Sequence, residues 1–212
     1  MTRLLFALTL ISGTAHAGNN LLVDTDTRAK TSVIGHKGSA LRMFKDKDYT
    51  GINSALTGLK LTVSPSTGEA CRLQVDREVL DQGGSMSEFD KALYQNMAPQ
   101  CVPLPGYPAT TTETVHFSAN GHFIRGVNVC LSGGDTIKQG VQGIKIWAAK
   151  VDKKSGNIQE MEDTAISKSN QCKNWQTKTF CPSGQVAYNI VGHYSGLNLQ
   201  GVQLVCADVK KW

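Results

Sequence analysis

The chain has 212 residues, of which 40% are hydrophobic and 18% charged, a balance typical of globular proteins and unlike that of intrinsically disordered segments. With 21 glycines and six cysteines, it lacks the far stronger compositional bias of collagens, coiled coils and disulfide knots. The formal net charge of +5 is mildly basic, and the densest basic runs, 150–154 and 210–211, are too short to predict a nucleic-acid partner.

The N-terminal segment has the pattern of an export signal. It carries one arginine, Arg3, then an apolar run over 4–11, and it ends in a small-x-small sequence at 15–17. A transmembrane helix needs about 20 apolar residues, which is more than twice this run. We therefore expect residues 1–17 to be a signal peptide of bacterial type. We expect 18–212 to form a single secreted or periplasmic domain without a transmembrane segment.

Three short segments further along share one pattern: apolar, polar, glycine, apolar, long polar, apolar. They are 56–61, 141–146 and 199–204. After the glycine the pattern alternates with period two, so the aliphatic residues face one side of a β-strand, and lysine or glutamine faces the other. The recurrence predicts one strand module that is used three times.

Each module is expected to consist of a strand, a polar loop and a return strand. The first and least regular module begins at 38–44, passes through a charged loop at 45–50 and returns along 54–63. The second module covers 118–147 and the third covers 181–206, each with a glycine-containing loop between its strands.

Residues 64–116 break this pattern, and we interpret them as an insertion. Ser85 and Glu88 fit a helix-capping box, and apolar residues then recur on one helical face. A short helix is therefore expected over 86–97, and Pro99 would prevent it from continuing. The proline-rich stretch 103–108 is expected to be an exposed loop.

Export would place the six cysteines in an oxidising compartment. An even number of cysteines in an oxidising compartment favours three disulfides over free thiols. No two of them have the spacing of a zinc site. Many pairings remain possible, so the spacing alone leaves the connectivity open. The cysteines are Cys71, Cys101, Cys130, Cys172, Cys181 and Cys206.

The third module resembles a known family. The cysteine-led turn 181–184, the strand and loop after it, and the return strand 199–206 are similar to one repeat of the vitelline membrane outer layer proteins. The segment 54–61 also resembles the post-loop strand of that repeat. The resemblance covers well under half of the chain. It implies an all-β fold, a three-sheet β-prism with approximate threefold symmetry, to which this chain would add the short helical insertion.

This sequence departs from the family pattern in two ways. The paired acidic residues of the family's loops are reduced to Asp135 or absent, and one repeat alone keeps both cysteines. The resemblance still implies a disulfide pairing, namely Cys181 with Cys206, Cys71 with Cys101, and Cys130 with Cys172. A competing pair, Cys172 with Cys181, stays open.

Local enzyme motifs are missing from the sequence. It has no nucleophile elbow, no zinc-protease helix, no phosphate-binding loop and no dinucleotide-binding glycine fingerprint. The histidines also lack the spacing of metal ligands. We therefore expect a non-catalytic protein without a metal or cofactor. A secreted hydrolase whose site is assembled from distant Asp, Glu and His residues is the enzymatic alternative.

The loops between the strands carry the candidate ligand contacts. An aromatic ring beside several hydrogen-bonding groups suits a sugar, because the C–H face of the sugar stacks on the ring while its hydroxyls need donors and acceptors. Loops are also polar and glycine-rich simply because they turn. The candidates are Asp48, Tyr49, Asp135, His193, Tyr194 and Asn198, together with Trp175, which is expected to be exposed.

Together, the sequence and the resemblance predict a secreted, lectin-like recognition protein. Its partner would be a glycan or another cell-surface ligand, bound by the inter-strand loops, and no nucleic-acid partner is expected. The alternative is an exported inhibitor or effector that binds a host or rival protein through the 64–116 insertion.

Overall fold

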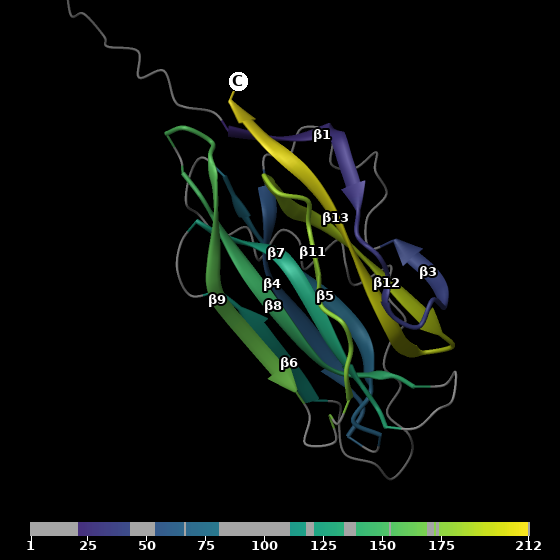
Figure 1. The fold of residues 1–212 in the computed structure, drawn as a ribbon. Coiled ribbons are helices and arrows are strands. Elements are labelled where there is room, and N and C mark those ends of the chain that lie inside the picture. The colour runs from purple at the N-terminus through teal and green to yellow at the C-terminus, as the bar shows by residue number, and fades with distance from the viewer. Residues whose placement is uncertain are drawn as a thin grey trace, which may run out of the picture.

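A computed structural model of the chain describes residues 21–42, 54–65, 67–80, 111–117, 121–133, 139–152, 154–168, 172 and 174–211. The regular structure in these ranges consists of β-strands, arranged in three antiparallel sheets (Figure 1). The expected signal peptide and the expected helix over 86–97 both lie outside the described residues. Within these ranges, no helix is long and apolar enough to cross a membrane.

Each sheet is built around one central hairpin. The first sheet has the order β1 (Leu21–Lys30), β13 (Asn198–Lys211), β12 (Gln185–Ser195) and β3 (Ser39–Arg42), and β2 (Ile34–Gly35) continues beside β13. The second has the order β10 (Asn174–Trp175), β7 (His122–Leu131), β8 (Val141–Val151) and β9 (Ile158–Lys168), and β11 (Thr179–Phe180) also pairs with β7. The third has the order β5 (Ala70–Val79), β4 (Ser54–Val63) and β6 (Thr111–His116).

The hairpins β4–β5, β7–β8 and β12–β13 share one register that contains two bulges. In the first strand of each hairpin one residue is skipped by the ladder, and these residues are Thr57, Arg125 and Tyr188. In the return strand the skipped residues are Cys71, Gln142 and Gln200. The two bulges stand at equivalent places in all three hairpins, which is the structural form of the internal repeat.

The bulges decide which side chains reach the core. A bulge adds one residue to its strand, so the core-facing positions are three residues apart across it and two apart elsewhere. In β4 these positions are Leu56, Leu59, Leu61 and Val63, and in β8 they are Val141, Ile144 and Ile146, all in one buried cluster. The sequence pattern of apolar, polar, glycine and apolar residues is therefore typical of a bulged strand.

The prediction that a strand module recurs three times is confirmed, with one correction. The segment 56–61 lies in β4, the first strand of its hairpin, whereas 141–146 and 199–204 lie in the return strands β8 and β13. Nor does β4 return against 38–44, because β3 pairs with β12 instead. Both strands of a hairpin carry a bulge of the same kind, so the pattern alone does not distinguish a first strand from a return strand.

Part of the expected insertion belongs to the third sheet. Both β5 and β6 lie within 64–116, and both pair with β4. Leu73 and Val75 of β5 are buried in the same core cluster as the residues of β8. The stretch 81–110, which contains the predicted helix, lies outside the described residues.

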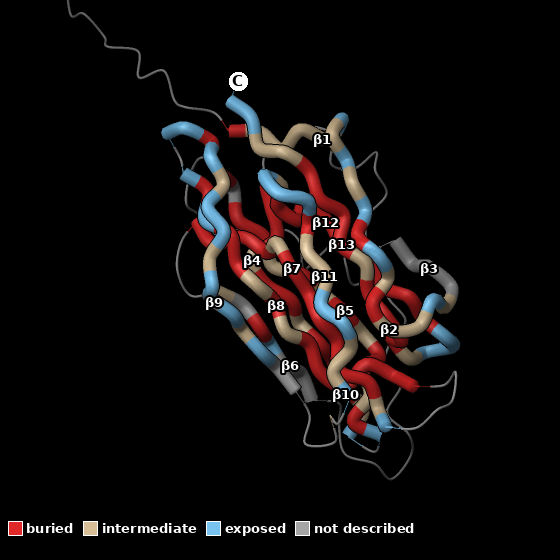
Figure 2. The backbone as a smooth tube through the Cα atoms, viewed as in Figure 1, coloured by how far each residue is buried: buried red, intermediate tan, exposed pale blue. Residues whose placement is uncertain are grey.

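Figure 2 shows how burial follows this arrangement, since β8, β12 and β13 are buried along most of their length and β9 is largely exposed. The main cluster takes residues from all three hairpins. A fully buried Val, Leu or Ile contributes about 1.5–3 kcal/mol relative to an exposed one. The shared core therefore holds the three sheets together.

Two of the disulfides implied by the resemblance are present, Cys181–Cys206 and Cys130–Cys172, so the competing pair Cys172–Cys181 was wrong. Cys71 is also disulfide-bonded, and its expected partner Cys101 lies outside the described residues. Each bridge contributes about 2–4 kcal/mol, much of it through the unfolded chain.

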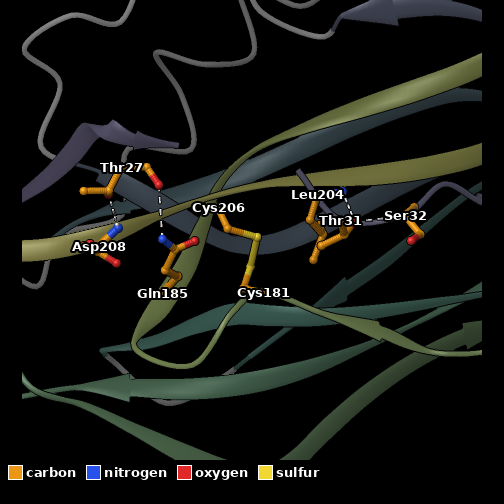
Figure 3. Close-up of a disulfide and its surroundings, with 8 residues drawn as sticks. All are labelled: Thr27, Thr31, Ser32, Cys181, Gln185, Leu204, Cys206 and Asp208. Carbon is orange, nitrogen blue, oxygen red and sulfur yellow. Dashed lines mark hydrogen bonds between the residues drawn. A yellow bond between two sulfur atoms is a disulfide. The ribbon is translucent and has the colours of Figure 1, made fainter. Parts of the chain in front are cut away.

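The Cys181–Cys206 bridge joins the segment between β11 and β12 to β13, and β1 is hydrogen-bonded beside it (Figure 3). There Gln185 Nε2 donates to the carbonyl oxygen of Thr27 at 3.1 Å, and the amide of Asp208 donates to Thr27 Oγ1 at 3.0 Å. The disulfide and these hydrogen bonds thus fix the same end of the first sheet.

We expect Gly201→Ala to destabilise the protein. A Cβ at this position would lie 2.6 Å from the carbonyl oxygen of Ile34 and 2.7 Å from that of His36, and backbone cannot move aside cheaply. The free energy of unfolding in urea should fall by about 1–3 kcal/mol. The control Ser195→Ala, at an exposed position, should change it by less than about 0.5 kcal/mol. Equal stability of the two variants would contradict the close approach of the 34–36 segment.

Candidate functional site

The turns of the three hairpins meet at one end of the sheets, which we call the hairpin end and define as the described residues of 64–69, 132–140 and 195–198. Glu69 connects them. Its Oε1 accepts hydrogen bonds from Ser132 Oγ at 3.0 Å and from the Gly140 amide at 3.1 Å. Its Oε2 accepts one from Asn198 Nδ2 at 2.8 Å. A single carboxylate thus links all three hairpins.

The turn between β4 and β5 holds Glu69 in place. Gly68 has a φ of 65°, a conformation that favours glycine, and its amide donates to the Ser64 carbonyl oxygen at 2.7 Å. The Ser64 amide in turn donates to the Glu69 carbonyl oxygen at 2.9 Å. Gly140 must also be small, because a Cβ there would lie 2.6 Å from the carboxyl carbon of Glu69.

Two glutamines and a histidine extend this polar network. Gln142, a bulged residue of β8, donates from Nε2 to the Thr67 carbonyl oxygen at 3.0 Å. His36 Nε2 lies 3.5 Å from Gln139 Oε1, and the His36 amide donates to the Gln200 carbonyl oxygen at 3.0 Å. The segment after β2 is therefore joined to the loop between β7 and β8 and to the bulge of β13.

Of the predicted ligand contacts, Asn198 lies in this network and is half-buried. Trp175 is half-buried rather than exposed, and it pairs with Cys130 near the end of β7, where the Cys130–Cys172 disulfide also attaches. Asp48, Tyr49 and Asp135 lie outside the described residues. The structure thus brings one predicted contact into the network and places a second on the strand pair beside it.

Tyr194 and His193 are buried in β12 instead of lying in a loop, with exposed fractions of 2% and 3%. The strand continues to Ser195, so the expected loop is a short turn. The ring of Tyr194 occupies the space that a Cβ of Gly192 would need, 2.7 Å from that position. In this arrangement neither side chain faces solvent, so neither offers a ligand an open surface.

Burial also changes the acid–base behaviour of the same two residues. It raises the pKa of Tyr194 to about 12, although the Leu73 backbone and the Arg72 charge act in the opposite direction. Burial lowers the pKa of His193, whose Nδ1 lies 3.4 Å from the Gly38 carbonyl oxygen. Both shifts favour the neutral form of a side chain that is removed from water.

The sequence analysis missed Glu69, the residue on which the hairpin end depends. Its signal was weak but present, because Glu69 is the sole charged residue between Lys60 and Arg72. A lone carboxylate in a turn of small polar residues needs hydrogen-bond donors, and here other hairpins supply three of them.

The chemistry of the hairpin end is that of hydrogen bonding beside a small apolar surface. Leu197, at the tip of the turn between β12 and β13, is 48% exposed, next to the exposed Ser195 and Gly196. No group of three or more His, Cys, Asp or Glu side chains that could hold a metal ion occurs in the described ranges. The arrangement can bind a polar ligand that also carries an apolar face.

No protein-family model and no curated protein sequence matches the chain. Solved structures match its fold. Frutalin from Artocarpus incisa has a TM-score of 0.52 at 10% identity, over 84% of this chain and 95% of frutalin. Single-chain recombinant jacalin has a TM-score of 0.50 at 11% identity, over 84% of this chain and 93% of jacalin.

A mannose-specific jacalin-related lectin from Morus nigra, solved in complex with mannose, has a TM-score of 0.49 at 9% identity, over 85% of this chain and 95% of the lectin. At such low identities the likeness concerns the fold alone. The matches to frutalin and jacalin confirm the expected three-sheet architecture: the chain has the β-prism fold of the jacalin-related lectins.

Glu69→Gln should weaken the hairpin end. An amide supplies a donor where one carboxylate oxygen now accepts, so at least one of the three hydrogen bonds is lost and a charge-assisted interaction becomes neutral. We expect the free energy of unfolding in urea to fall by about 1–3 kcal/mol. Glu162→Gln, the same change at an exposed position, is the matched control and should have an effect below about 0.5 kcal/mol. Indistinguishable unfolding curves would show that Glu69 does not link the hairpins.

Tyr194 should make the fold sensitive to alkaline pH. The unfolded chain releases the phenolic proton near the ordinary pKa of 10.0, whereas the folded chain keeps it up to about 12. The folded state thus binds more protons between these values, and the free energy of unfolding should fall by about 2–3 kcal/mol as the pH rises through this window. Urea unfolding of the wild type and of Tyr194→Phe tests this, since the variant should lose that part of the slope. If the free energy of unfolding depends on pH in the same way in the wild type and in Tyr194→Phe, the Tyr194 hydroxyl is in contact with water and the expectation is wrong.

Proposed function

We propose that the protein is an exported, non-catalytic recognition protein that binds a carbohydrate at the hairpin end. The observation that carries this proposal is the convergence of three hairpin turns on Glu69, which fixes hydrogen-bonding groups from three sheets before any ligand arrives. Preorganised groups lose less conformational entropy on binding than mobile ones do.

Two residues of the hairpin end, the half-buried Asn198 and the exposed Leu197, fit a sugar. Asn198 is held through its Nδ2, and its Oδ1, which accepts no hydrogen bond from the described residues, can accept one from a sugar hydroxyl. Leu197 beside it offers an apolar surface for the C–H groups of the ring. A ligand with hydroxyls on its edges and C–H groups on its face would use both.

The fold supports the same proposal. Frutalin and jacalin share the β-prism architecture with this chain, which is the fold of the jacalin-related lectins. Fold likeness by itself does not establish function, so the proposal depends on the residues of the hairpin end. The motif resemblance to the vitelline membrane outer layer proteins agrees with this fold, and we infer a distant relationship with them.

Export is part of the proposal. Disulfides persist in oxidising compartments, and this chain contains Cys130–Cys172, Cys181–Cys206 and a disulfide-bonded Cys71. They support the secreted or periplasmic location that the signal-like segment 1–17 predicts. A location on the outside of a cell would also bring the protein to cell-surface glycans.

A glycan array of neutral oligosaccharides, followed by calorimetry with the best ligand, tests the proposal. We expect Asn198→Ala and Leu197→Ser each to weaken binding roughly tenfold, which corresponds to about 1.4 kcal/mol. Leu197→Ser is the more discriminating change, because this side chain contacts solvent and its loss should leave the stability unchanged.

Ile166→Ser is the matched control, since Ile166 is also a large exposed apolar residue but lies on β9, not in a turn. It should bind the glycan as the wild type does. A wild-type protein that binds no glycan, or one whose binding survives both hairpin-end variants, would contradict the proposal.

A further inference from the structure

The second sheet carries a cluster of aromatic and cationic side chains on the face directed away from the core. Its aromatic centre is Trp147 of β8 and Phe180 of β11, whose ring centroids are 5.4 Å apart in an edge-to-face arrangement. Between them lies Gly126 of β7, which pairs with both residues in the ladder. A Cβ on Gly126 would lie 2.3 Å from the ring of Phe180, so the glycine makes room for this ring.

Three cations lie over these rings. Lys145 Nζ is 5.0 Å from the centroid of Trp147, and Lys178 Nζ is 5.9 Å from the same centroid and 5.5 Å from that of Phe180. The guanidinium of Arg125 lies 4.8 Å above Phe180. We call these five residues the cationic face. Attraction to the ring quadrupoles holds the cations in place despite their mutual repulsion.

The charge of the cationic face is only partly balanced. Arg125 forms an ion pair with Glu160 of β9. Lys145 and Lys178 form no ion pair with any carboxylate in the described part of the chain. Two ammonium groups that share one indole ring therefore remain available to an anion, and a bound anion would reduce the repulsion between them.

We propose that the cationic face is a second binding surface, one that takes an acidic polysaccharide through its sulfate or carboxylate groups. Lys145 and Lys178 contact neighbouring anionic groups along the sugar chain, and Trp147 and Phe180 position the two ammonium groups. This surface is independent of the neutral sugar proposed for the hairpin end.

Charge complementarity calls for an anionic partner, and the apolar and aromatic groups of this face favour a polysaccharide over a membrane or a nucleic acid. Ile166, opposite Lys145 in the ladder, is the one large apolar residue exposed on this sheet in the described ranges, which is too little to insert into a lipid bilayer. Single-stranded nucleic acids stack their bases on open aromatic faces, whereas ammonium groups lie over the rings here. Anionic groups on a flexible, hydroxyl-rich chain need only the two cations.

The test compares dextran sulfate with unsulfated dextran, two polymers that share a glucan backbone and differ in its sulfate groups, by measuring their binding to the protein at several salt concentrations. We expect the wild type to bind dextran sulfate more tightly than dextran, with an affinity for the sulfated polymer that falls as salt rises. The double variant Lys145→Gln/Lys178→Gln should bind dextran sulfate roughly tenfold more weakly. Lys145→Arg/Lys178→Arg should keep most of the affinity, because the charge and the cation–π contacts remain.

Lys154→Gln/Lys211→Gln removes the same charge from exposed positions in the turn after β8 and at the end of β13, and it serves as the matched control. If this control loses as much affinity as the double variant, net charge alone explains the binding and the proposed surface is wrong. The proposal would also be wrong if the protein did not bind dextran sulfate. It would equally be wrong if the two lysines supported stronger binding to phosphatidylserine vesicles than to dextran sulfate. If the double variant still binds the neutral glycan, this surface is separate from the hairpin end. The two proposals are tested with different ligands, so one can fail while the other is still tested.

Discussion

The fold depends on one geometric constraint, the pair of β-bulges that each central hairpin carries at equivalent positions. A regular strand would alternate its side chains without interruption, whereas each bulge adds a residue, increases the local twist and restarts the inward alternation one step later. The apolar residues of all six hairpin strands thereby reach a single buried cluster. Because the same two irregularities recur in each hairpin, the three sheets curve alike and can close around that cluster.

At the end where the hairpins turn, closing the core leaves polar groups partly buried, and these groups need hydrogen-bond partners. Turns bring backbone groups and short polar side chains together, and a partly buried carboxylate among them costs free energy unless donors meet it. Glu69 meets this requirement with donors from the two other hairpins, and charge-assisted hydrogen bonds of this kind are stronger than neutral ones. The interaction that fixes the ends of the sheets relative to one another is therefore also the one that fixes Asn198, the residue that we propose contacts a sugar.

Sequence reasoning predicts what is local in this structure and misses what depends on distant contacts. The spacing of apolar residues around Gly58, Gly143 and Gly201 shows that strands recur, because the pattern that marks a bulge spans only six residues of sequence. It does not show that 56–61 is a first strand, because that depends on pairing with β5. The partners of Glu69 are 63, 71 and 129 residues away in the chain, so no local pattern identifies that network. The burial of Tyr194 was within reach, since period-two alternation from Ile190 places Tyr194 on the core side, but the glycines nearby suggested a loop.

The two proposed surfaces differ in how strongly the fold constrains them. Residues of the hairpin end serve the closure of the core as well as any ligand, so most changes there act on stability and binding together. The cationic face lies on the outer side of β7 and β8, where the inward alternation already satisfies the core and leaves positions such as 145 and 147 to be determined by something else. Trp147 and Phe180 flank a glycine there and hold lysine ammonium groups over their rings, an arrangement that the apolar core does not require. Cation–π attraction explains why the lysines lie over the rings, and the proposed binding role would explain why two ammonium groups without an ion-pair partner in the described residues stand together there.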